Sequence, residues 1–401
     1  MGMTKIVQHF LLGICLPVFF ISCVEPFEPQ IINFESALVV EATLTDENKL
    51  QEVYLSRTFP LDTTGIYGEN GAVVQVTDSD GGMFDFTHQG EGKYVSNTSF
   101  AVRTGIGYRL NIITSDGKEY ISEEEIAPDP TQIDSLYAER DFKDGGLEEG
   151  MFIYVDTYDA SGKNKYYRYE YEETYRIEAP LWNNEEWVLY DNGNLDVNLW
   201  DFEIRSKRHE DRICYASDTS TTVIQVATNK LGEERISKFP VRFIDRNNYI
   251  ISHRYSILVK QYVQSYNAYT YYQTLEKFSS TENPFSQIQT GFFGGNMTSV
   301  DNDSEKVLGF FGVSSVAEKR IFFNYMDFFA GESLPPYANR CYYIYPVKKP
   351  NEAIYYNLVR YFGPNSGQLD VAPTGATLFV PPACGDCREL GSNVKPDFWE
   401  E

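Results

Sequence analysis

Short runs in which apolar and polar residues alternate, separated by turn-forming residues, occupy most of the chain beyond residue 36. The first run is typical, with apolar side chains at every second position: Leu38, Val40, Ala42 and Leu44. A period of two places one face of an extended strand against a core, whereas a helix needs a period near 3.6. Aromatic residues make up 15% of the chain, and Tyr and Phe favour strands. The sequence therefore predicts a mainly β fold.

Residues 37–127 contain about seven of these runs, at the spacing of an all-β sandwich. Turns rich in Asp and Gly predict two hairpins: 71–76 with 83–86, and 108–112 with 120–121. The segment contains no Cys or Trp, so we expect an immunoglobulin- or transthyretin-like sandwich rather than a true immunoglobulin domain. The acidic run 123–125 is expected at a solvated edge, because charges protect exposed strands from pairing.

A second, fibronectin-III-like β-rich domain is expected over residues 131–380, after the prolines at 128 and 130 interrupt the first pattern. Its strands 152–156 and 167–171 are predicted to form a hairpin. The polar segment 183–212 shows no periodicity and is expected to be a long irregular excursion. Further strands are predicted at 223–226, 255–259, 307–313 and 321–323.

One helix is predicted, over residues 265–279. Ser265 can accept a hydrogen bond from a backbone N–H of the first turn. Tyr269, Tyr272 and Leu275 recur at three-residue spacing and would share one face of the helix.

The first 23 residues have the layout of an exported lipoprotein. Lys5 precedes an apolar run at 10–21, which is shorter than the roughly 20 residues of a bilayer span and contains Pro17. Ser22 before Cys23 resembles a bacterial lipobox, which implies removal of residues 1–22 and acylation of Cys23, palmitate included. An ordinary cleaved signal with Cys23 free for a disulfide is the alternative.

Residues 23–36 are predicted to be an extended tether, because prolines at 26 and 29 disfavour a helix. The acids at 25 and 28 resemble the tag that sends some Gram-negative lipoproteins to the outer cell surface, and a plain linker is an equal alternative. We therefore expect the protein at the outer membrane, held in its lipid through Cys23 and facing the cell exterior.

Four cysteines follow the tether: Cys214, Cys341, Cys384 and Cys387. An even number in an exported chain favours two disulfides, for which three connectivities are possible. We prefer Cys214–Cys341 with Cys384–Cys387, in a coil tail over 381–401. A structural zinc site needs four ligands, and Cys-Gly-Asp-Cys stands in a Pro-rich tail rather than at a helix start. No metal site and no cofactor are predicted.

The charge balance excludes nucleic acid as a partner. The chain has 34 Lys and Arg against 58 Asp and Glu, a net charge of −24, and such a surface repels phosphates. The basic residues near 205–212 lie among acids and are expected in a solvated loop. The run 301–305 has the oxygen ligands that calcium prefers but lacks the EF-hand glycine and spacing, so a polar turn is expected.

No enzyme is predicted, because the chain has no nucleophile elbow, HExxH helix, P-loop or dinucleotide-binding glycine motif. Three tryptophans lie between residues 181 and 212, in or directly before the irregular excursion: Trp182, Trp187 and Trp200. Exposed aromatic residues on β-sandwiches can bind sugars, so a surface adhesin or glycan-binding module is one functional hypothesis. Ordinary packing of a long loop is the competing interpretation of these tryptophans.

Several segments, in order, resemble the lipoprotein family catalogued as domain of unknown function 4249: 22–27, 38–41, 55–58, 71–74, 133–136, 166–169, 269–272, 295–296, 307–311, 319–320, 384–388 and 396–399. Members are encoded near TonB-dependent outer-membrane receptors, and the family has no agreed activity or catalytic residues. The resemblance implies a non-catalytic, surface-exposed accessory or ligand-capturing partner of such a receptor in nutrient uptake.

Overall fold

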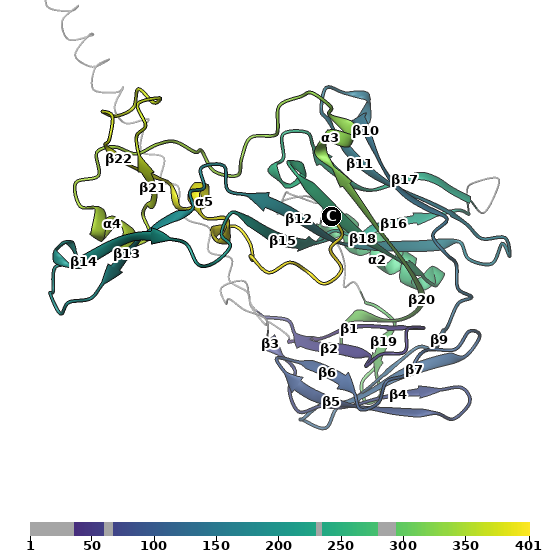
Figure 1. The fold of residues 1–401 in the computed structure, drawn as a ribbon. Helices are drawn as coiled ribbons and strands as arrows, with labels where there is room; N and C mark the ends of the chain where they lie inside the picture. Colours follow the sequence, from purple (N-terminus) through teal and green to yellow (C-terminus); the bar gives the residue numbers. More distant parts are fainter. Residues whose placement is uncertain (1–35, 60–66, 230–234, 280–293) are drawn as a thin grey trace, which may run out of the picture.

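The computed structural model describes residues 36–59, 67–229, 235–279 and 294–401. It is mainly β, as the alternating runs predicted, with several sheets and few helices. Figure 1 shows three bodies, which we call the N-terminal body, the central body and the side body. The side body projects from the central body, on the left of the view.

In the N-terminal body, the strands form a sandwich-like arrangement around one apolar core. Both predicted hairpins are confirmed, because β4 pairs with β5 and β7 pairs with β8. Its strands are β1 (Leu38–Thr45), β2 (Glu52–Arg57), β3 (Tyr67–Gly68), β4 (Val73–Asp78), β5 (Met83–Gly90), β6 (Lys93–Ser96), β7 (Gly107–Ile113), β8 (Glu119–Ser122), β9 (Glu125–Ile126) and β19 (Met297–Ser299). β19, from much later in the chain, pairs with β8.

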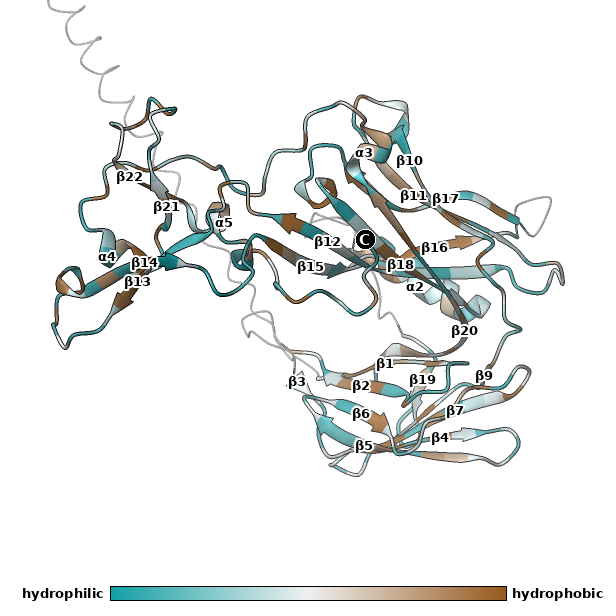
Figure 2. Cartoon of the chain, viewed as in Figure 1, coloured by the Kyte–Doolittle hydropathy of each residue, from teal (hydrophilic) through white to brown (hydrophobic). Residues whose placement is uncertain are grey.

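A single strand of 18 residues, β20 (Val307–Asn324), joins the N-terminal body to the central body. The sequence predicted two separate strands here, at 307–313 and 321–323. Instead, residues 307–314 pair in parallel with β1, and residues 315–324 pair antiparallel with β18 (Arg254–Val263). Most residues of the first half are buried, and Figure 2 colours much of β20 as hydrophobic. The two bodies are therefore parts of one hydrogen-bonded sheet.

The central body packs a three-stranded sheet against the large sheet. The three strands are β10 (Ser135–Phe142), β11 (Glu149–Tyr158) and β17 (Arg235–Asp245). The large sheet contributes β12 (Tyr166–Glu178), β15 (Ile213–Thr219), β16 (Ile224–Ala227), β18 and the second half of β20. The helical segments are η2 (Lys143–Gly145), η4 (Tyr249–Ile251), α2 (Tyr266–Ser279) and α3 (Tyr325–Phe328).

The predicted hairpin of 152–156 with 167–171 is wrong. These residues lie in β11 and β12, which belong to different sheets: β11 pairs with β10 and β17, whereas β12 pairs with β15, β16 and β18. The apolar faces of both strands pack into the same core, so the strands stack across it. Between them, the Asp159 carboxylate accepts backbone N–H bonds from Ser161, Lys163 and Asn164 and holds the crossover.

The predicted helix is confirmed as α2. Ser265 Oγ accepts the backbone N–H of Ala268 at 3.1 Å, which is the capping role expected from the sequence. The helix packs against β12 and β20, at the junction of the N-terminal and central bodies.

The side body contradicts the expectation that 183–212 is irregular. β13 (Glu185–Tyr190) and β14 (Asp201–Ser206) form a hairpin, with η3 (Val197–Leu199) between them. The hairpin was missed because neither strand has a fully buried face that would produce alternation. It packs beside β21 (Arg360–Pro364), β22 (Thr377–Val380) and α4 (Pro350–Tyr355) around a small apolar core.

The acidic run 123–125 was expected to be solvated, and this is wrong for Glu125. Glu125 is only 3% exposed, because it lies in β9 beside β20. Asn296 Nδ2 lies 3.5 Å from Glu125 Oε1 and also donates to the Phe311 carbonyl at 2.8 Å. Burial raises the pKa of Glu125, and the charge of the nearby Glu123 raises it further. Hydrogen bonds from Ser265 and Asn296 lower the pKa but do not cancel the increase.

We predict that Gly309→Ala strongly destabilises the protein. Gly309 has φ +94°, and an added Cβ would overlap the carbonyl oxygen of Val40 on β1. Strain and overlap should lower the free energy of unfolding by about 2–4 kcal/mol in urea titrations. Gly312→Ala is the control, because the nearest atom to its added Cβ would be Thr43 Oγ1 at 3.7 Å, an ordinary van der Waals contact. Equal effects of the two substitutions would contradict the assignment.

We also predict that Glu125→Gln stabilises the protein increasingly as the pH rises. Below the ordinary Glu pKa the carboxyl is protonated in both states, so it contributes no pH dependence. Because the pKa of Glu125 is raised in the folded state, its carboxyl ionises first in the unfolded chain as the pH rises. The folded state therefore loses stability relative to the unfolded state. The advantage of the variant should therefore grow between about pH 4 and about pH 7. Urea unfolding at both pH values tests this, and exposed Glu124→Gln should show no such trend.

Candidate functional site

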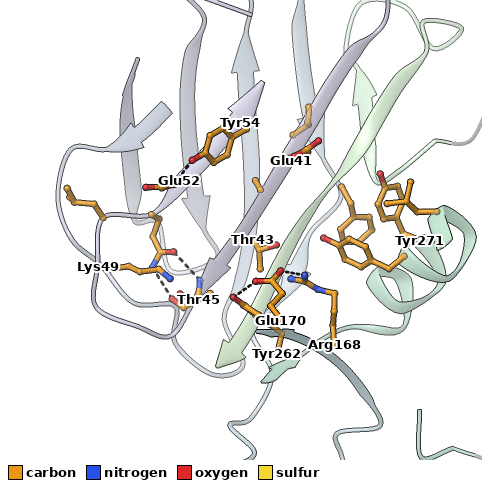
Figure 3. Close-up of a pocket in the computed structure, with 17 residues that line it drawn as sticks. Glu41, Thr43, Thr45, Lys49, Glu52, Tyr54, Arg168, Glu170, Tyr262 and Tyr271 are labelled. Carbon is orange, nitrogen blue, oxygen red and sulfur yellow. Dashed lines mark hydrogen bonds and ion pairs between the residues drawn. The ribbon is translucent and has the colours of Figure 1, made fainter. Parts of the chain in front are cut away.

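A cleft of about 680 Å³ lies between the N-terminal and central bodies (Figure 3). We call it the interbody cleft. β1, β2 and the loop between them form one wall, and β12, β18, α2 and β20 form the other. Its aromatic and apolar lining includes Leu50, Tyr54, Tyr262, Tyr271, Tyr272, Leu275 and Phe310, and its charged lining is Glu41, Lys49, Glu52, Arg168 and Glu170.

Arg168 on β12 is held in the cleft by rings and a carboxylate. Its guanidinium lies 4.5 Å from the Tyr262 ring centre and 4.8 Å from that of Tyr272, and it forms an ion pair with Glu170. The Tyr262 hydroxyl donates to Glu170 Oε2 at 2.9 Å. Burial, together with the Glu170 charge, raises the Tyr262 pKa. The charged groups on this side of the cleft are therefore already paired with each other.

The opposite side is centred on Glu41 of β1. Its carboxylate is exposed and makes no hydrogen bond or ion pair within the described part of the chain. The Tyr271 ring of α2 lies 5.2 Å from the Phe310 ring. Burial raises the pKa of Tyr271 to about 12, with smaller contributions from the neighbouring Tyr272 and from Glu41.

The loop between β1 and β2 is braced by Gln51, which is 0% exposed. Its side-chain amide donates to the carbonyls of Thr45 at 3.1 Å and Phe100 at 2.9 Å, and its oxygen accepts from the Thr45 N–H at 3.2 Å. Such a satisfied buried amide fixes the backbone around it. This wall of the cleft is therefore pre-formed.

Sequence reasoning missed the cleft although it used the strand that builds it. Along β12 the side chains of Tyr167 and Tyr169 face the core, as the alternation indicated. The intervening Arg168 and Glu170 face the cleft. A polar strand face that is covered by a second body has the same pattern as one that faces water, so the sequence gives no signal for the difference.

The three tryptophans of the excursion are separated and packed. Trp182 packs on the central core and donates from Nε1 to Asp211 at 2.6 Å. Trp187 stacks on Phe202 with ring centres 4.0 Å apart and donates to Asn351. Trp200 donates to the Asn194 carbonyl at 2.8 Å. These contacts do not test sugar binding, so the sugar-binding hypothesis stays a prediction.

All four later cysteines form disulfides, but the preferred pairing is wrong. The bonds are Cys214–Cys387 and Cys341–Cys384. The tail turns through α5 (Pro382–Gly385) and η5 (Cys387–Glu389). In this turn Cys387 meets Cys214 on β15 of the central body, whereas Cys384 meets Cys341 in the loop after α3. The two tail cysteines therefore fasten two different segments instead of each other.

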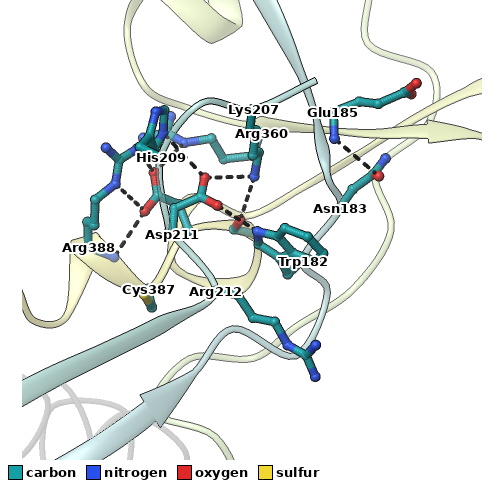
Figure 4. Close-up of polar contacts among 12 residues, drawn as sticks. Trp182, Asn183, Glu185, Lys207, His209, Asp211, Arg212, Arg360, Cys387 and Arg388 are labelled. Atoms are coloured by element: carbon teal, nitrogen blue, oxygen red, sulfur yellow. Dashed lines mark hydrogen bonds and ion pairs between the residues drawn. The ribbon is translucent and has the colours of Figure 1, made fainter. Parts of the chain in front are cut away.

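A buried ion-pair cluster surrounds this turn (Figure 4). Lys207 Nζ lies 2.7 Å from Asp211 Oδ2, with side chains only 9% and 3% exposed, so the expected solvated loop is wrong here. Arg388 donates to Asp386 at 2.7 and 2.9 Å. Burial would raise the Asp386 pKa, but hydrogen bonds from the Arg388 side chain and backbone outweigh it, so the pKa lies below its ordinary range.

Metal binding finds no support in the geometry. Across the described ranges, no group of three or more His, Cys, Asp or Glu side chains is placed to hold a metal ion. The run 301–305 is a turn in which Asn302 Oδ1 accepts from Ser304. Glu305 Oε1 accepts from Lys118 and Tyr120, at 2.9 and 2.8 Å.

The anchor prediction falls outside the described residues, because Cys23, the signal 1–22 and most of the tether precede residue 36. Within the described ranges, no helix has the length and apolar character needed to cross a bilayer.

Comparison with protein-family models identifies the family to which the sequence is similar. The model of a family described as a domain of unknown function (DUF4249) matches residues 24–320. No curated protein matches the chain. The matched residues include both walls of the interbody cleft. Of the four disulfide cysteines, Cys214 lies within the match, and Cys341, Cys384 and Cys387 lie beyond it.

We predict that Asp211→Ala loosens the side body. The substitution removes the acceptor of the Trp182 indole N–H and the only carboxylate partner described for the buried Lys207 ammonium, which keeps the Gly385 carbonyl at 3.5 Å. Removing one partner of a buried pair should cost about 3–5 kcal/mol of unfolding free energy, with faster amide exchange in β13 and β14. Glu203→Ala on the exposed face of β14 is the control. Unchanged exchange in the Asp211 variant would contradict this role.

Proposed function

Because the chain belongs to the family described as a domain of unknown function (DUF4249), we propose that it is a non-catalytic outer-membrane lipoprotein. In this proposal it is anchored through acylated Cys23 and faces the cell exterior. It captures a ligand in the interbody cleft and delivers it to a TonB-dependent receptor during nutrient uptake. The family itself carries no agreed activity, so the proposal rests on the residues of this chain.

The interbody cleft is the observation that carries the proposal. Its volume of about 680 Å³ lies within the range of about 300–1,000 Å³ typical of ligand sites, and such sites favour junctions between domains. Two of its three carboxylates are already held in ion pairs. Glu170 is paired with Arg168, and Glu52 is paired with Lys93 at 2.8 Å, so neither is poised as a general acid or base.

The side body supports a protein partner. It exposes apolar side chains of its hairpin, of the turn between the hairpin strands, and of α4 with the loop after it: Tyr190, Leu195, Leu199, Phe202, Ile204, Tyr355, Tyr356 and Leu358. Exposed apolar side chains gathered on a projecting body are typical of interaction surfaces. A lipid anchor with a flexible tether would raise the local concentration of this surface beside a membrane receptor.

A surface adhesin or glycan-binding module is the second candidate. The exposed ring of Tyr54 beside the cleft carboxylates favours it, because sugars stack on aromatic faces. The tryptophans that suggested this function from the sequence do not contribute to the cleft.

We predict that Cys23→Ala releases the protein from the membrane. Without the thiol there is no acyl chain, each buried CH₂ of which contributes about 0.8 kcal/mol to membrane binding. Intact-mass spectrometry and palmitate labelling should show acylation of the wild type only. Cys15→Ala, within the segment expected to be removed, is the control.

The receptor is tested in the same strains. A TonB-dependent barrel should co-purify with the wild-type protein in mild detergent and be lost with a side-body variant carrying Leu195→Asp and Leu199→Asp. Absence of any barrel from the wild-type preparation would overturn the receptor partnership. Unmodified Cys23 would overturn the anchor.

A further inference from the structure

We propose that the ligand of the interbody cleft is an organic cation, an ammonium group carried on an apolar body. This inference rests on the ligand-capturing part of the function proposed above and names the chemical class of what is captured. It is carried by the arrangement of Glu41 on β1 between aromatic residues on the two strands that flank β1.

The strand register places the carboxylate between two rings. Glu41 on β1 is the direct partner of Tyr54 on β2 and of Phe310 on β20. Side chains directly opposite each other on adjacent strands share one face of the sheet. Val40 and Ala42, the neighbours of Glu41, face the core, so this row faces the cleft. Tyr271 from α2 then packs on Phe310 and completes the aromatic wall.

Aromatic faces beside a carboxylate suit a cation. The face of an aromatic ring is electron-rich and attracts ammonium groups within about 6 Å, and such sites recognise quaternary ammonium ligands. The cleft already shows this preference internally, because Arg168 lies over Tyr262 and Tyr272. Lys93 Nζ lies 5.5 Å from the centre of the Tyr54 ring. Glu41 and the aromatic rings beside it offer the same combination of a carboxylate and aromatic faces to a cationic ligand.

The charge balance of the cleft also favours a cation. Arg168 is neutralised by Glu170, Lys49 lies 2.5 Å from Glu47, and Lys93 pairs with Glu52. Glu41 is the cleft carboxylate that has no such partner among the described residues. The net charge of −24 would raise the local concentration of cations and repel anions.

The test uses the full mature chain in a neutral detergent, with benzyltrimethylammonium as the probe and isothermal titration calorimetry as the readout. The wild type should bind the probe, and Glu41→Gln, which keeps the side-chain size, should weaken binding about tenfold. Exposed Glu119→Gln on β8 is the matched control and should leave affinity unchanged. Affinity should fall as salt is added, since exposed charge pairs are screened.

A second pair of variants tests the aromatic contribution. Tyr54→Phe keeps the ring and should retain the affinity, whereas Tyr54→Leu removes it and should lose several-fold. Circular dichroism melting of each variant separates lost binding from lost folding.

Three results would overturn the inference: no heat with the ammonium probe, equal affinity in the wild type and Glu41→Gln, or binding of maltohexaose in place of the probe. The last result would favour the glycan-binding candidate. These outcomes are separable from failure of the proposed receptor partnership, because co-purification of a barrel does not depend on Glu41. If no barrel co-purifies but the protein still binds the ammonium probe in a Glu41-dependent way, the receptor partnership is overturned and the proposed ligand class stands.

Discussion

The continuous strand β20 is the constraint on which the arrangement of the two large bodies depends. Its first half completes the N-terminal sheet beside β1, and its second half lies beside β18 in the central body. Both halves are tied by regular backbone hydrogen bonds, so the two bodies cannot shift independently without breaking a ladder. The walls of the interbody cleft are thereby held at one separation. A glycine at position 309 allows β20 to approach β1 closely at the point where the cleft begins.

Several buried charges in the described part of the chain are fully paired, whereas the Glu41 carboxylate of the cleft is exposed and has no such partner there. Glu173 in the central body accepts from Arg242 at 3.0 and 3.1 Å and from the Tyr255 hydroxyl at 2.5 Å. Lys207 and Asp211 form a similar set beneath the side body. Burying charge is tolerated when each group is paired and hydrogen-bonded. Against this pattern, a carboxylate left open between aromatic rings is consistent with a binding site rather than with a structural role.

Sequence reasoning identified strands and two local hairpins, but not the pairing of strands that are distant in the sequence. The alternation at 38–45 and the Asp-Gly turns identified β1 and two hairpins, because side-chain period and turn chemistry are local properties. The pairing of β1 with β20 depends on residues more than 260 positions apart, and no local pattern encodes it. For the same reason β11 and β12 were taken for a hairpin.

The cleft and the disulfides show the same limit. Arg168 and Glu170 occupy the polar face of a strand, and only the N-terminal body, packed above them, turns that face into a wall. The cysteine count predicted two bonds correctly, whereas their connectivity depends on how the tail turns between Cys384 and Cys387. Local spacing favoured a bond within the tail, and tertiary contacts placed each sulfur against a different segment.

The parallel pairing of β1 with β20 has a consequence for biogenesis. β1 is among the first segments of the folded part to leave the ribosome, but its neighbour at 307–314 is made much later. Throughout that interval one edge of the first sheet displays unpaired N–H and C=O groups, which is a template for wrong association with other chains. A nascent polypeptide of this design needs protection until its late segment is made, so the early sheet edge is a point at which a chaperone would act.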